Sequence, residues 1–350
     1  MRGAERTFAA MADLYPDAPI LTLLYDAQGT SQRFGGREIT TSPLQRLGVR
    51  QGSFRRLLPL YPRMVERLPV PACDVVLSSS SAFALGVHAP AGAIHLCYCY
   101  TPFRYAWYEQ QVALREAPAP LRPALALLLA RMRRWDLAAS RRVDRFIAIS
   151  ELSRERIQRY YNREAAVIHP PVETHRFAPG VPGDSLLLVS EIVGHKRVQI
   201  ALEAARRAHA SIRIVGSGPD HEALSAAYPE AEFLGRVGDQ ELAELYAGAR
   251  AVIVPSMEEF GITAVEAQAA GRPVIAAAAG GALETVLDGE TGRFATLDDV
   301  DSFASAIASI DQLAFDPGRA VEQAERFSVA AFQAKIAVAV TDALENGAGS

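Results

Sequence analysis

The 350-residue sequence predicts an α/β protein built from two doubly wound, parallel-sheet domains. Short runs rich in Val, Ile and Leu recur between longer segments of helical character, which is typical of buried parallel strands joined by crossover helices. Hydrophobic residues make up 49% of the chain and charged residues 22%, so the chain can bury a large core and is long enough for two domains. This composition excludes a disordered chain, a collagen-like fibre and a small disulfide scaffold.

Nine apolar runs are predicted to be strands, and several of them are followed by a small or polar turn that leads into a helical segment. The runs are 19–25, 74–78, 93–98, 145–150, 166–169, 185–190, 212–215, 251–255 and 273–277. Ligands bind at the carboxyl ends of the strands in such sheets, so the turns after these runs are the candidate site segments.

A Pro/Gly cluster at 178–184 is the best candidate for a domain boundary, because it separates two strand patterns with turn residues. We therefore expect an N-terminal domain over 1–178 and a C-terminal domain over 184–330. A last helix over 331–350 is expected to pack back toward the first domain.

The stretch 117–143 is predicted to form a helix with one apolar face and with arginines elsewhere. The apolar face holds Leu125, Leu128, Leu129, Met132 and Trp135, and the arginines are Arg131, Arg133, Arg134, Arg141 and Arg142. Packing of the apolar face on its own domain is the commoner arrangement for such a helix. Contact of this helix with a membrane surface is the alternative.

Charge is distributed unevenly along the chain. Residues 1–175 carry 23 Arg against 15 acidic residues, while residues 176–350 carry 13 basic against 25 acidic residues. The basic half suggests an anionic partner, such as phospholipid headgroups or lipid diphosphates, without requiring nucleic acid; general solubility is the other explanation. All basic residues of the chain are arginines except Lys196 and Lys335. Lys196 therefore departs from the chain's general use of arginine and is a candidate for a specific role.

Two carboxylates, Glu258 and Glu266, stand eight residues apart after a predicted strand. A helix starting near Gly261 would place Glu258 in the loop and Glu266 about one turn into the helix, so that both face one ligand. Free backbone N–H groups at such a helix start attract phosphate or a polarised hydroxyl. Here these groups would belong to Phe260, Gly261 and Ile262. The alternative is a helix start enriched in acids because of the helix dipole.

Other strand ends carry candidate anion-binding residues. Lys196 and Arg197 follow the strand at 185–190, and a lysine that opens the next helix opposes the helix dipole, which favours an anion-binding role. Glycine permits close approach of a backbone to a diphosphate or nucleotide, although a lone Gly-x-Gly is common in ordinary turns. The candidate glycines are Gly216, Gly218, Gly280 and Gly281.

The C-terminal half resembles the retaining glycosyltransferases of family 4 in four segments that follow one another along the chain: those around Lys196, Gly216–Gly218, Glu258–Glu266 and Gly280–Gly281. The likeness covers nearly the whole chain. The segments 97–107 (Cys-Tyr-Cys-Tyr-Thr-Pro-Phe-Arg-Tyr-Ala-Trp) and 167–172 (Val-Ile-His-Pro-Pro-Val) are similar to the bacterial mannosyltransferase branch that builds O-antigen and exopolysaccharide. The resemblance implies the GT-B fold, in which two Rossmann-like domains face each other across a cleft.

The resemblance also implies roles for individual residues. Glu258 would contact the hydroxyls of the donor sugar, Glu266 the nucleotide ribose, and Lys196 the donor diphosphate. Tyr100 stands where family members carry a histidine that reaches the donor sugar or phosphate, so the catalytic candidates are Glu258, Lys196 and Tyr100. The donor-binding candidates are Glu266, Arg197, Gly216, Gly218, Phe260, Gly261, Ile262, Gly280 and Gly281. The acceptor-side candidates are Gly3, Arg104 and Tyr105.

Two further positions depart from the family pattern. Members usually begin with a hydrophobic strand and a glycine-rich loop, whereas residues 1–6 (Met-Arg-Gly-Ala-Glu-Arg) resemble the end of that loop, so the first strand of the N-terminal domain is expected to be missing. Many members carry an arginine at the position of Glu191.

No metal and no cofactor is assigned. The segment 299–301 (Asp-Val-Asp) has the form that other glycosyltransferase folds use for a divalent metal, but it opens a predicted helix at 302–310, and helix capping is the stronger interpretation. The co-substrate would be a nucleotide sugar, with GDP-mannose favoured.

The resemblance thus implies a retaining, metal-independent hexosyltransferase that moves mannose from GDP-mannose to a lipid-linked saccharide acceptor. The expected partners are the nucleotide sugar, this acceptor and an anionic membrane surface, with no nucleic acid. The longest aliphatic run near the middle, 124–130, is far shorter than the roughly 20 residues that span a bilayer, and no secretory signal is visible. The three cysteines, Cys73, Cys97 and Cys99, favour a reducing compartment, so we expect a cytoplasmic protein, peripheral at the inner face of the bacterial plasma membrane.

Two alternatives stay open. One is a catalytically weakened GT-B protein that binds a nucleotide sugar or a partner enzyme without turnover, which Tyr100 and the short N-terminus would suit. The other is a sugar-nucleotide epimerase of related architecture, against which the Glu258–Glu266 spacing and the segment 100–105 argue.

Overall fold

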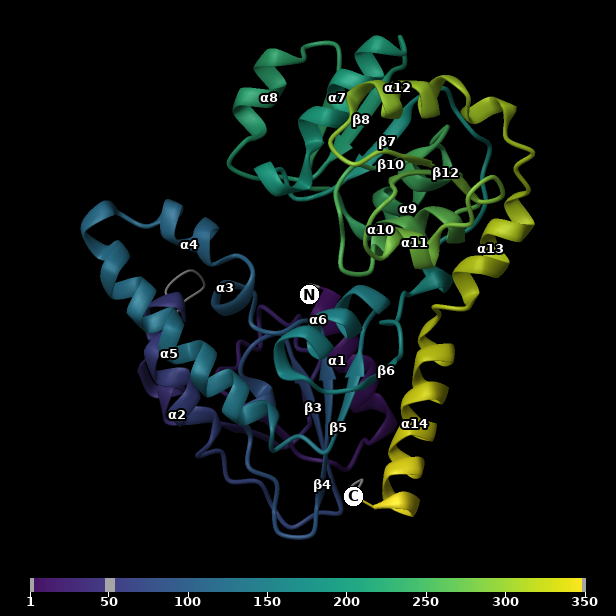
Figure 1. Cartoon of the computed structure of the whole chain (residues 1–350). Helices are drawn as coiled ribbons and strands as arrows, with labels where there is room; N and C mark the ends of the chain where they lie inside the picture. Colours follow the sequence, from purple (N-terminus) through teal and green to yellow (C-terminus); the bar gives the residue numbers. More distant parts are fainter. Residues whose placement is uncertain (1–2, 48–53, 348–350) are drawn as a thin grey trace. The chain divides into compact units, whose positions relative to one another are not determined.

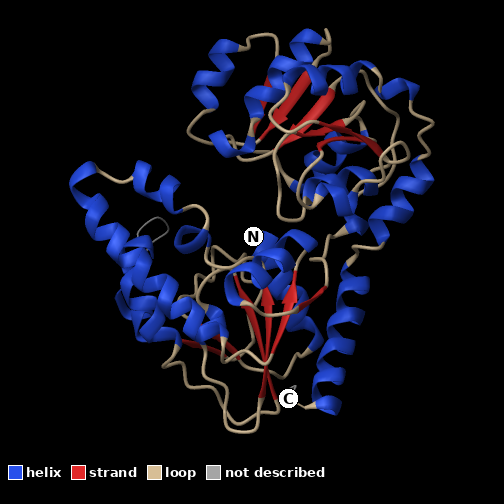
Figure 2. Ribbon diagram, viewed as in Figure 1, coloured by secondary structure: helices blue, strands red, loops and turns tan. Residues whose placement is uncertain are grey.

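The computed structural model describes residues 3–47 and 54–347. The chain forms two compact units, each with its own parallel sheet (Figures 1 and 2). Unit 1 contains the residues up to His169 together with those from Gln333 onward, and unit 2 contains Pro170–Phe332.

Unit 1 is built around a four-stranded sheet in the order β3-β4-β5-β6, in which every neighbouring pair is parallel. Its strands are β1 (Ile20–Thr22), β2 (Ile39–Thr41), β3 (Val75–Ser80), β4 (Ile94–Cys99), β5 (Arg145–Ala148) and β6 (Ala165–Val167). Its helices are α1 (Gly3–Leu14), α2 (Tyr61–Val65), α3 (Arg104–Trp107), α4 (Gln110–Glu116), α5 (Arg122–Ser140) and α6 (Glu151–Tyr161), with short 3-10 turns η1 (Pro43–Leu47), η2 (Phe54–Leu60), η3 (Ala84–Gly86) and η4 (Ala119–Leu121). β1 and β2 form a separate parallel pair, and the first described element is a helix.

The core of unit 1 lies between this sheet and helices α5 and α6. Cys97 and Cys99 of β4 pack with Phe146 of β5, Ala139 of α5 and Ile157 of α6. α14 (Val329–Asn346) is also held to unit 1, since Gln333 donates a hydrogen bond to the carbonyl of Ala10 at 2.9 Å. The three cysteines are free thiols.

The apolar face that the sequence predicts on α5 packs inside unit 1. Leu129 and Met132 are buried in a cluster with Phe103 and Ala106, and Leu125 packs against the same cluster. The packing interpretation of this helix is therefore confirmed, and the idea that this face rests on a membrane is wrong, because α3 covers it.

Unit 2 is a six-stranded sheet, and all of its neighbouring strands are parallel. Its strands are β7 (Leu186–Val189), β8 (Ile212–Val215), β9 (Glu232–Gly235), β10 (Val252–Val254), β11 (Val274–Ala277) and β12 (Gly292–Ala295). Its helices are α7 (Val198–Arg207), α8 (His221–Ala227), α9 (Asp239–Ala247), α10 (Ile262–Ala269), α11 (Ala282–Thr285), α12 (Val300–Ala308) and α13 (Pro317–Glu325), with 3-10 turns η5 (Thr174–Arg176), η6 (Gly194–Lys196) and η7 (Ile310–Gln312).

The strand order of unit 2 is β12-β11-β10-β7-β8-β9. The chain builds outward from β7 through β8 to β9, then returns to place β10 on the other side of β7 and builds outward again to β12. This is the doubly wound Rossmann order, and its topological switch point lies between β7 and β10. Loops that leave these two strands diverge at their carboxyl ends, which is where ligands bind in such sheets.

The observed units divide the chain earlier than the expected boundary at 178–184. Val172 donates a backbone hydrogen bond to the carbonyl of Phe327 at 2.8 Å, and the ring of Phe177 lies 5.3 Å from that of Tyr246, so this stretch packs on unit 2. The Pro/Gly cluster is also fastened to unit 2, since Arg272 Nη2 donates to the carbonyl of Gly180 at 2.9 Å. At the other end the division falls inside α14, between residues 332 and 333, rather than at 330.

Candidate functional site at the carboxyl ends of the unit 2 strands

The predicted carboxylate Glu258 and the predicted cation Lys196 meet at the switch point of unit 2. Lys196 ends η6, in the connection after β7, and Glu258 follows β10, the neighbour of β7 in the sheet. Lys196 Nζ donates to Glu258 Oε1 at 2.8 Å and to Oε2 at 2.6 Å. The Lys196 side chain is 24% exposed and that of Glu258 is 22% exposed, so the ion pair is largely shielded yet reachable from solvent.

Ser256 completes the setting of Glu258. Its hydroxyl donates to Glu258 Oε1 at 2.5 Å, and Ser256 itself is buried. The carboxylate therefore accepts charge-assisted hydrogen bonds from two sides, which fixes its orientation. Sequence reasoning did not single out Ser256, although its place directly after a buried strand offered a signal.

The second carboxylate of the motif has a different environment. Glu266 is the fifth residue of α10, only 9% exposed, and its Oε2 accepts a hydrogen bond from the hydroxyl of Tyr246 at 2.8 Å. Tyr246 lies on α9 and is fully buried, and burial together with the adjacent Glu266 raises the pKa of this phenol well above its ordinary value of 10. The phenol therefore stays protonated and donates to Glu266. Nothing in the sequence pattern distinguished Tyr246 from an ordinary core residue.

Helix α10 begins near Gly261, as the sequence predicted. Gly261 is the N-cap, with a positive φ of 91°, and the helix runs from Ile262. Phe260, just before it, is buried against the ring of Phe327 at 5.4 Å. Three of the donor-binding candidates thus form the turn between Glu258 and Glu266: Phe260, Gly261 and Ile262.

The glycine pair after β11 makes room for protein backbone. A Cβ at Gly280 would lie 2.3 Å from the carbonyl oxygen of Glu258, and one at Gly281 would lie 2.2 Å from that of Phe260. Gly281 also donates a backbone hydrogen bond to the carbonyl of Glu258 at 2.9 Å. These glycines therefore hold the Glu258 loop against the β11–α11 loop; their contact with a diphosphate stays a prediction.

Gly216 and Gly218 have a similar role after β8. A Cβ at Gly216 would lie 1.8 Å from the carbonyl oxygen of Ser190, and one at Gly218 would lie 2.1 Å from that of Ile192. Both glycines let the loop after β8 lie directly on the loop after β7. The loop that leads to Lys196 is thus shaped by its neighbour.

Arg197, next to Lys196, forms an ion pair with Asp298, a residue that the sequence analysis did not name. It has a left-handed backbone with φ of 54°, and its Nη2 donates to Asp298 Oδ2 at 2.9 Å. The hydrogen bonds and charge of Asp298 raise the pKa of Arg197, and those of Arg197 lower the pKa of Asp298. In this structure the guanidinium of Arg197 is thus engaged by the loop after β12.

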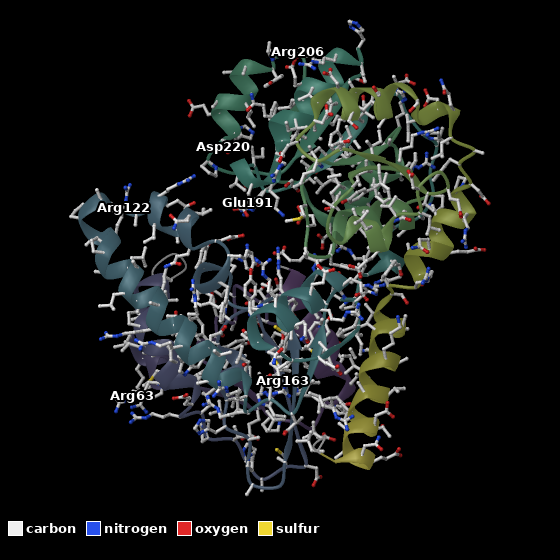
Figure 3. All side chains as sticks on the ribbon, viewed as in Figure 1. Arg63, Arg122, Arg163, Glu191, Arg206 and Asp220 are labelled. Atoms are coloured by element: carbon white, nitrogen blue, oxygen red, sulfur yellow. The ribbon has the colours of Figure 1, made fainter. Side chains whose placement is uncertain are left out.

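Two carboxylates follow neighbouring strands at the same end of the sheet. Glu191 follows β7 and is exposed, and Asp220, which is half-buried, precedes α8 (Figure 3). The Oδ2 of Asp220 lies 4.0 Å from the position of a Cβ at Gly194, so the β8 loop brings this carboxylate to the loop that leads to Lys196. Arg206, at the other end of α7, lies away from this edge (Figure 3).

The segment 299–301 caps a helix, as the sequence analysis favoured. Asp299 is the N-cap of α12, and its Oδ1 accepts a hydrogen bond from the backbone N–H of Ser302 at 3.1 Å. Asp301 forms an ion pair with Arg207. Among the described residues, no group of three or more His, Cys, Asp or Glu side chains is arranged to hold a metal ion.

The remaining candidates lie in unit 1, at the carboxyl end of β4. The Tyr100 hydroxyl lies 3.0 Å from Ser79 Oγ and donates to the carbonyl of Ala4 at 3.0 Å, which places it beside Gly3 at the start of α1. Burial raises the pKa of Tyr100 to about 12. The phenol is therefore neutral at physiological pH and tied to β3 and α1.

Arg104 and Tyr105 open α3, a few residues after Tyr100. The side chain of Arg104 is 40% exposed, and the ring of Tyr105 lies 6.1 Å from that of Phe103. The structure thus brings Tyr100 to the start of α1, beside Gly3, and places Arg104 and Tyr105 on α3, which begins four residues after Tyr100.

Two family models match the chain, one in each half. Residues 1–176 match the family model described as Glycosyltransferase Family 4, and residues 183–312 match the model described as glycosyl transferases group 1. A D-inositol 3-phosphate glycosyltransferase of Kribbella flavida is 32% identical in an alignment of 228 residues, and the match covers 53% of this chain and 53% of the relative. A second such protein, of Catenulispora acidiphila, is 30% identical in an alignment of 244 residues, and the match covers 58% of this chain and 57% of the relative. The chain thus spans about half the length of the curated relatives that it matches.

Solved structures share the fold over nearly the full chain. Anabaena Alr3699/HepE in complex with UDP has a TM-score of 0.71 at 18% identity and covers 97% of this chain and 96% of its own. The apo form of the lipopolysaccharide outer core galactosyltransferase WaaB has a TM-score of 0.69 at 14% identity, covering 98% of this chain and 96% of its own. These likenesses show the GT-B fold with two Rossmann-like domains. Since the Glycosyltransferase Family 4 model alone accounts for half of the sequence, the chain belongs to glycosyltransferase family 4.

Proposed function

We propose that this protein is a retaining glycosyltransferase that transfers a hexose from a nucleotide sugar to a lipid-linked saccharide acceptor in cell-surface polysaccharide synthesis. The observation that carries the proposal is the Lys196–Glu258 pair, with Nζ 2.6 Å from Oε2, at the topological switch point of unit 2. A cation and a carboxylate held together at that point suit a ligand that carries both a diphosphate and hydroxyl groups.

The shielding of the pair supports this chemistry. Opposite charges that are mostly removed from water interact more strongly with a ligand than fully exposed ones do. Lys196 would neutralise the charge that develops on the departing diphosphate, together with the backbone N–H groups near Gly261 and Gly280; the N–H of Gly281 donates to the carbonyl of Glu258. Glu258, held by Ser256, would accept hydrogen bonds from the donor sugar hydroxyls.

The reaction we propose breaks the bond between the sugar C1 and the diphosphate oxygen, and its electron pair stays on the leaving phosphate. The acceptor hydroxyl attacks C1 from the face that the phosphate leaves, and its proton passes to a phosphate oxygen. Atoms and charge balance without a covalent protein intermediate, and the configuration at C1 is retained.

Mannose from GDP-mannose is the donor that we place first, because segments 97–107 and 167–172 resemble the bacterial mannosyltransferase branch. Solved structures of similar fold contain UDP or UDP-glucose, so UDP-sugars belong in the same test. We further propose that turnover needs no divalent metal, since Asp299 and Asp301 serve α12 as a helix cap and as a partner of Arg207.

The test is a panel of GDP- and UDP-sugars, in EDTA, in which release of the nucleoside diphosphate and transfer to a lipid-linked acceptor are both measured. One donor is expected to stand out, and NMR of the product is expected to show retained anomeric configuration. An inverted product would contradict the mechanism, and turnover that stops in EDTA would contradict metal independence.

Variants connect the result to the site. Lys196→Ala removes a charge-assisted contact of about 1.5–3 kcal/mol, so calorimetric titration should show nucleoside diphosphate affinity falling roughly 10- to 100-fold. Lys335→Ala, at the only other lysine, is the matched control and should bind normally. Glu258→Gln should impair transfer while sparing nucleoside diphosphate affinity; full turnover by Glu258→Gln would refute the role of this carboxylate.

One pattern would favour the non-catalytic alternative. If nucleoside diphosphates bound in a Lys196-dependent manner and no donor of the panel was turned over, the protein would be a nucleotide-sugar-binding member of its family. The departures at Tyr100 and Glu191 from the family pattern are the observations that keep this outcome in the test.

A further inference from the structure

Exposed apolar side chains gather at one corner of unit 1, which we call the α4–α5 corner and define as residues 110–134. Val112 of α4 is 46% exposed, Leu121 of η4 is 56% exposed and Leu127 of α5 is 54% exposed. Figure 1 shows α4 joined to the first turn of α5 by a short connection that stands away from the sheet of unit 1. Prolines at 118, 120 and 123 shape this connection and are themselves exposed.

The same corner is basic. It holds five arginines, Arg115, Arg122, Arg131, Arg133 and Arg134, and the single acidic residue Glu116. All of these arginines except Arg133 are exposed. Arg122 stands at the end of the corner in Figure 3, where its Nε donates to the carbonyl of Ala117 at 3.1 Å.

Helix geometry sorts α5 into two faces. Leu127, Arg131 and Arg134 follow one another at i, i+4 and i+7, which places them on one outward stripe, and all of them are exposed. The opposite face carries Leu129 and Met132, which are buried in the cluster with Phe103. Folding of unit 1 thus uses the inner face and leaves the outer stripe to solvent.

Along the outer stripe of α5 the order of side chains is apolar first and basic behind, while Arg122 stands beside Leu121 at the end of the corner, with a side chain long enough to reach the headgroup layer. Leu121 and Leu127 lie in the connection and first turns of α5, and Arg131 and Arg134 lie about 6 Å and 10 Å farther along the helix than Leu127, at 1.5 Å rise per residue. A bilayer surface presents acyl chains beneath a layer of headgroups, and interfacial helices bury apolar residues about 5–10 Å deep while basic residues stay with anionic headgroups. A soluble protein partner would need acidic groups in register with these arginines, whereas an anionic bilayer supplies negative charge everywhere.

We propose that the α4–α5 corner binds an anionic bilayer surface, with Val112, Leu121 and Leu127 entering the headgroup region and the exposed arginines contacting lipid phosphates. The inference stands apart from the proposed transferase activity, because vesicle binding requires neither donor nor turnover. The sequence analysis considered the inner face of α5 as the membrane contact. The proposed contact instead uses the side chains of the corner that the structure leaves exposed.

The experiment is cosedimentation of the full chain with vesicles of phosphatidylglycerol or of phosphatidylcholine. The protein should bind the anionic vesicles, bind the neutral ones at least tenfold more weakly, and lose affinity as salt rises. Arg131→Glu/Arg134→Glu should lower binding at least 25-fold, since each basic residue near an anionic surface contributes about fivefold. Leu121→Ser/Leu127→Ser should also lower binding, and should abolish the part that persists at high salt.

Matched controls separate this surface from general effects. Arg63→Glu/Arg159→Glu changes the net charge equally at exposed arginines of unit 1 outside the corner, and Val338→Ser replaces an apolar side chain on α14 that is 59% exposed. Both should bind vesicles as the original chain does. Equal losses in the controls, equal binding to neutral vesicles, or a corner variant that binds normally would each overturn the proposal.

Two further measurements keep the outcomes distinct. Size-exclusion chromatography of the Leu121→Ser/Leu127→Ser variant tests whether the corner instead joins two copies of the chain; a dimer that this variant dissociates would overturn the proposal in favour of self-association. Nucleoside diphosphate affinity in solution should be the same for corner variants and the original chain, so that failure of membrane binding and failure of the transferase proposal are read separately.

Discussion

The two glutamates of the candidate site have the same chemistry and different surroundings. Glu258 is held by Lys196 and Ser256 at the mouth of the β10 loop, while Glu266 is buried beneath it on α10 against Tyr246. The eight-residue spacing predicted their places in the loop and on the helix. It did not predict Ser256 or Tyr246 as partners, because a hydrogen bond to a residue on another element depends on tertiary packing rather than on local pattern.

Tyr246→Phe should weaken ribose recognition if Glu266 contacts the ribose. Loss of the hydroxyl removes one hydrogen-bond donor from a buried carboxylate, which costs about 1–3 kcal/mol and weakens the hold on the orientation of Glu266. We expect affinity for the preferred nucleoside diphosphate to fall about tenfold in calorimetric titration. Affinity for inorganic pyrophosphate, which has no ribose, should stay unchanged.

Tyr228→Phe is the control for this prediction, because Tyr228 is the other buried tyrosine of unit 2. It should bind both ligands as the original chain does. If Tyr246→Phe weakened pyrophosphate as much as nucleoside diphosphate, the tyrosine would support the fold of unit 2 and not the orientation of Glu266.

At the scale of elements, buried strands were the most predictable part of the fold. Each of the nine predicted runs overlaps an observed strand. Six of these strands lie inside a parallel sheet, where both faces are covered and the strand is largely apolar: β4, β5, β7, β8, β10 and β11. The strands that were missed in unit 2, β9 and β12, are the two edges of its sheet. Their sequences, Glu-Phe-Leu-Gly and Gly-Arg-Phe-Ala, mix polar and apolar residues because an edge strand is half solvated, so no continuous apolar run marks them.

The glycine-rich loops were predicted in place, and the space they create is occupied by backbone of neighbouring loops. Gly281→Ala tests this at an element boundary, since Gly281 is the N-cap of α11 with φ of −64°, a backbone that alanine adopts freely. The backbone of Phe260 forbids the Cβ, which would lie 2.2 Å from its carbonyl oxygen, 2.3 Å from its Cα and 2.4 Å from its carbonyl carbon. We expect a loss of about 1–3 kcal/mol in stability and, because the Glu258 loop must move, a much larger fractional loss of turnover than of stability.

Gly238→Ala is a close match, because Gly238 is the N-cap of α9 and a Cβ there would meet nothing within 4 Å. This control should retain both stability and turnover, measured by thermal unfolding and by the donor assay. Full activity of Gly281→Ala would show that the contact between the two loops does not position Glu258.

Asp136 links three helices of unit 1 in a way that makes its stability depend on pH. The carboxylate on α5 accepts hydrogen bonds from Trp107 Nε1 of α3 and from the Tyr161 hydroxyl of α6, both at 2.7 Å. Burial raises the pKa of Asp136 to about 6, against the lowering effect of these hydrogen bonds and of the backbone N–H of Phe103.

Because the folded pKa lies above the unfolded value of about 3.9, the folded state binds the proton more tightly. The contribution to stability is therefore fully present below about pH 4, is lost as pH rises to about 6 at roughly 1.4 kcal/mol per pH unit, and is constant above that. Asp136→Asn cannot titrate, so the original chain should lose stability relative to this variant only between about pH 4 and 6. Urea unfolding at a series of pH values measures the difference, and a difference that did not change with pH would contradict the raised pKa.

At the scale of the whole molecule, composition predicted two domains and their opposite charge. The predicted border at 178–184 lies beside the change from one family model to the other, between residues 176 and 183, and a few residues after the division of the two compact units at 169–170. The Pro/Gly cluster at 178–184 has the composition of a linker, yet its backbone is hydrogen-bonded to unit 2 at Gly180 and Gly183. Turn residues mark irregular backbone, and irregular backbone on the surface of a domain has the same composition as backbone between domains. The last helix was expected to pack toward the first domain, and the residues from Gln333 onward belong to unit 1. Only the residue of the division was hidden, because a continuous helix gives no signal where its packing partner changes.

Because each unit has its own core, we expect a donor ligand to stabilise unit 2 selectively. Every donor-binding candidate lies in unit 2, whose buried cluster runs through β7, β8, β10 and β11, whereas both tryptophans, Trp107 and Trp135, lie in unit 1. Tryptophan fluorescence therefore follows the unfolding of unit 1, while far-UV circular dichroism follows both units.

A nucleoside diphosphate at about 100 times its Kd should add roughly 2.7 kcal/mol to the free energy of unfolding of unit 2. In urea, the circular dichroism transition should shift to higher concentration while the fluorescence transition stays in place. Lys196→Ala should cut the added free energy to about 0.4–1.4 kcal/mol at the same ligand concentration, because its affinity is expected to be 10- to 100-fold weaker. A fluorescence transition that moved equally with ligand would mean that the two units unfold as one cooperative body, and the separate cores would then not act as separate folding units.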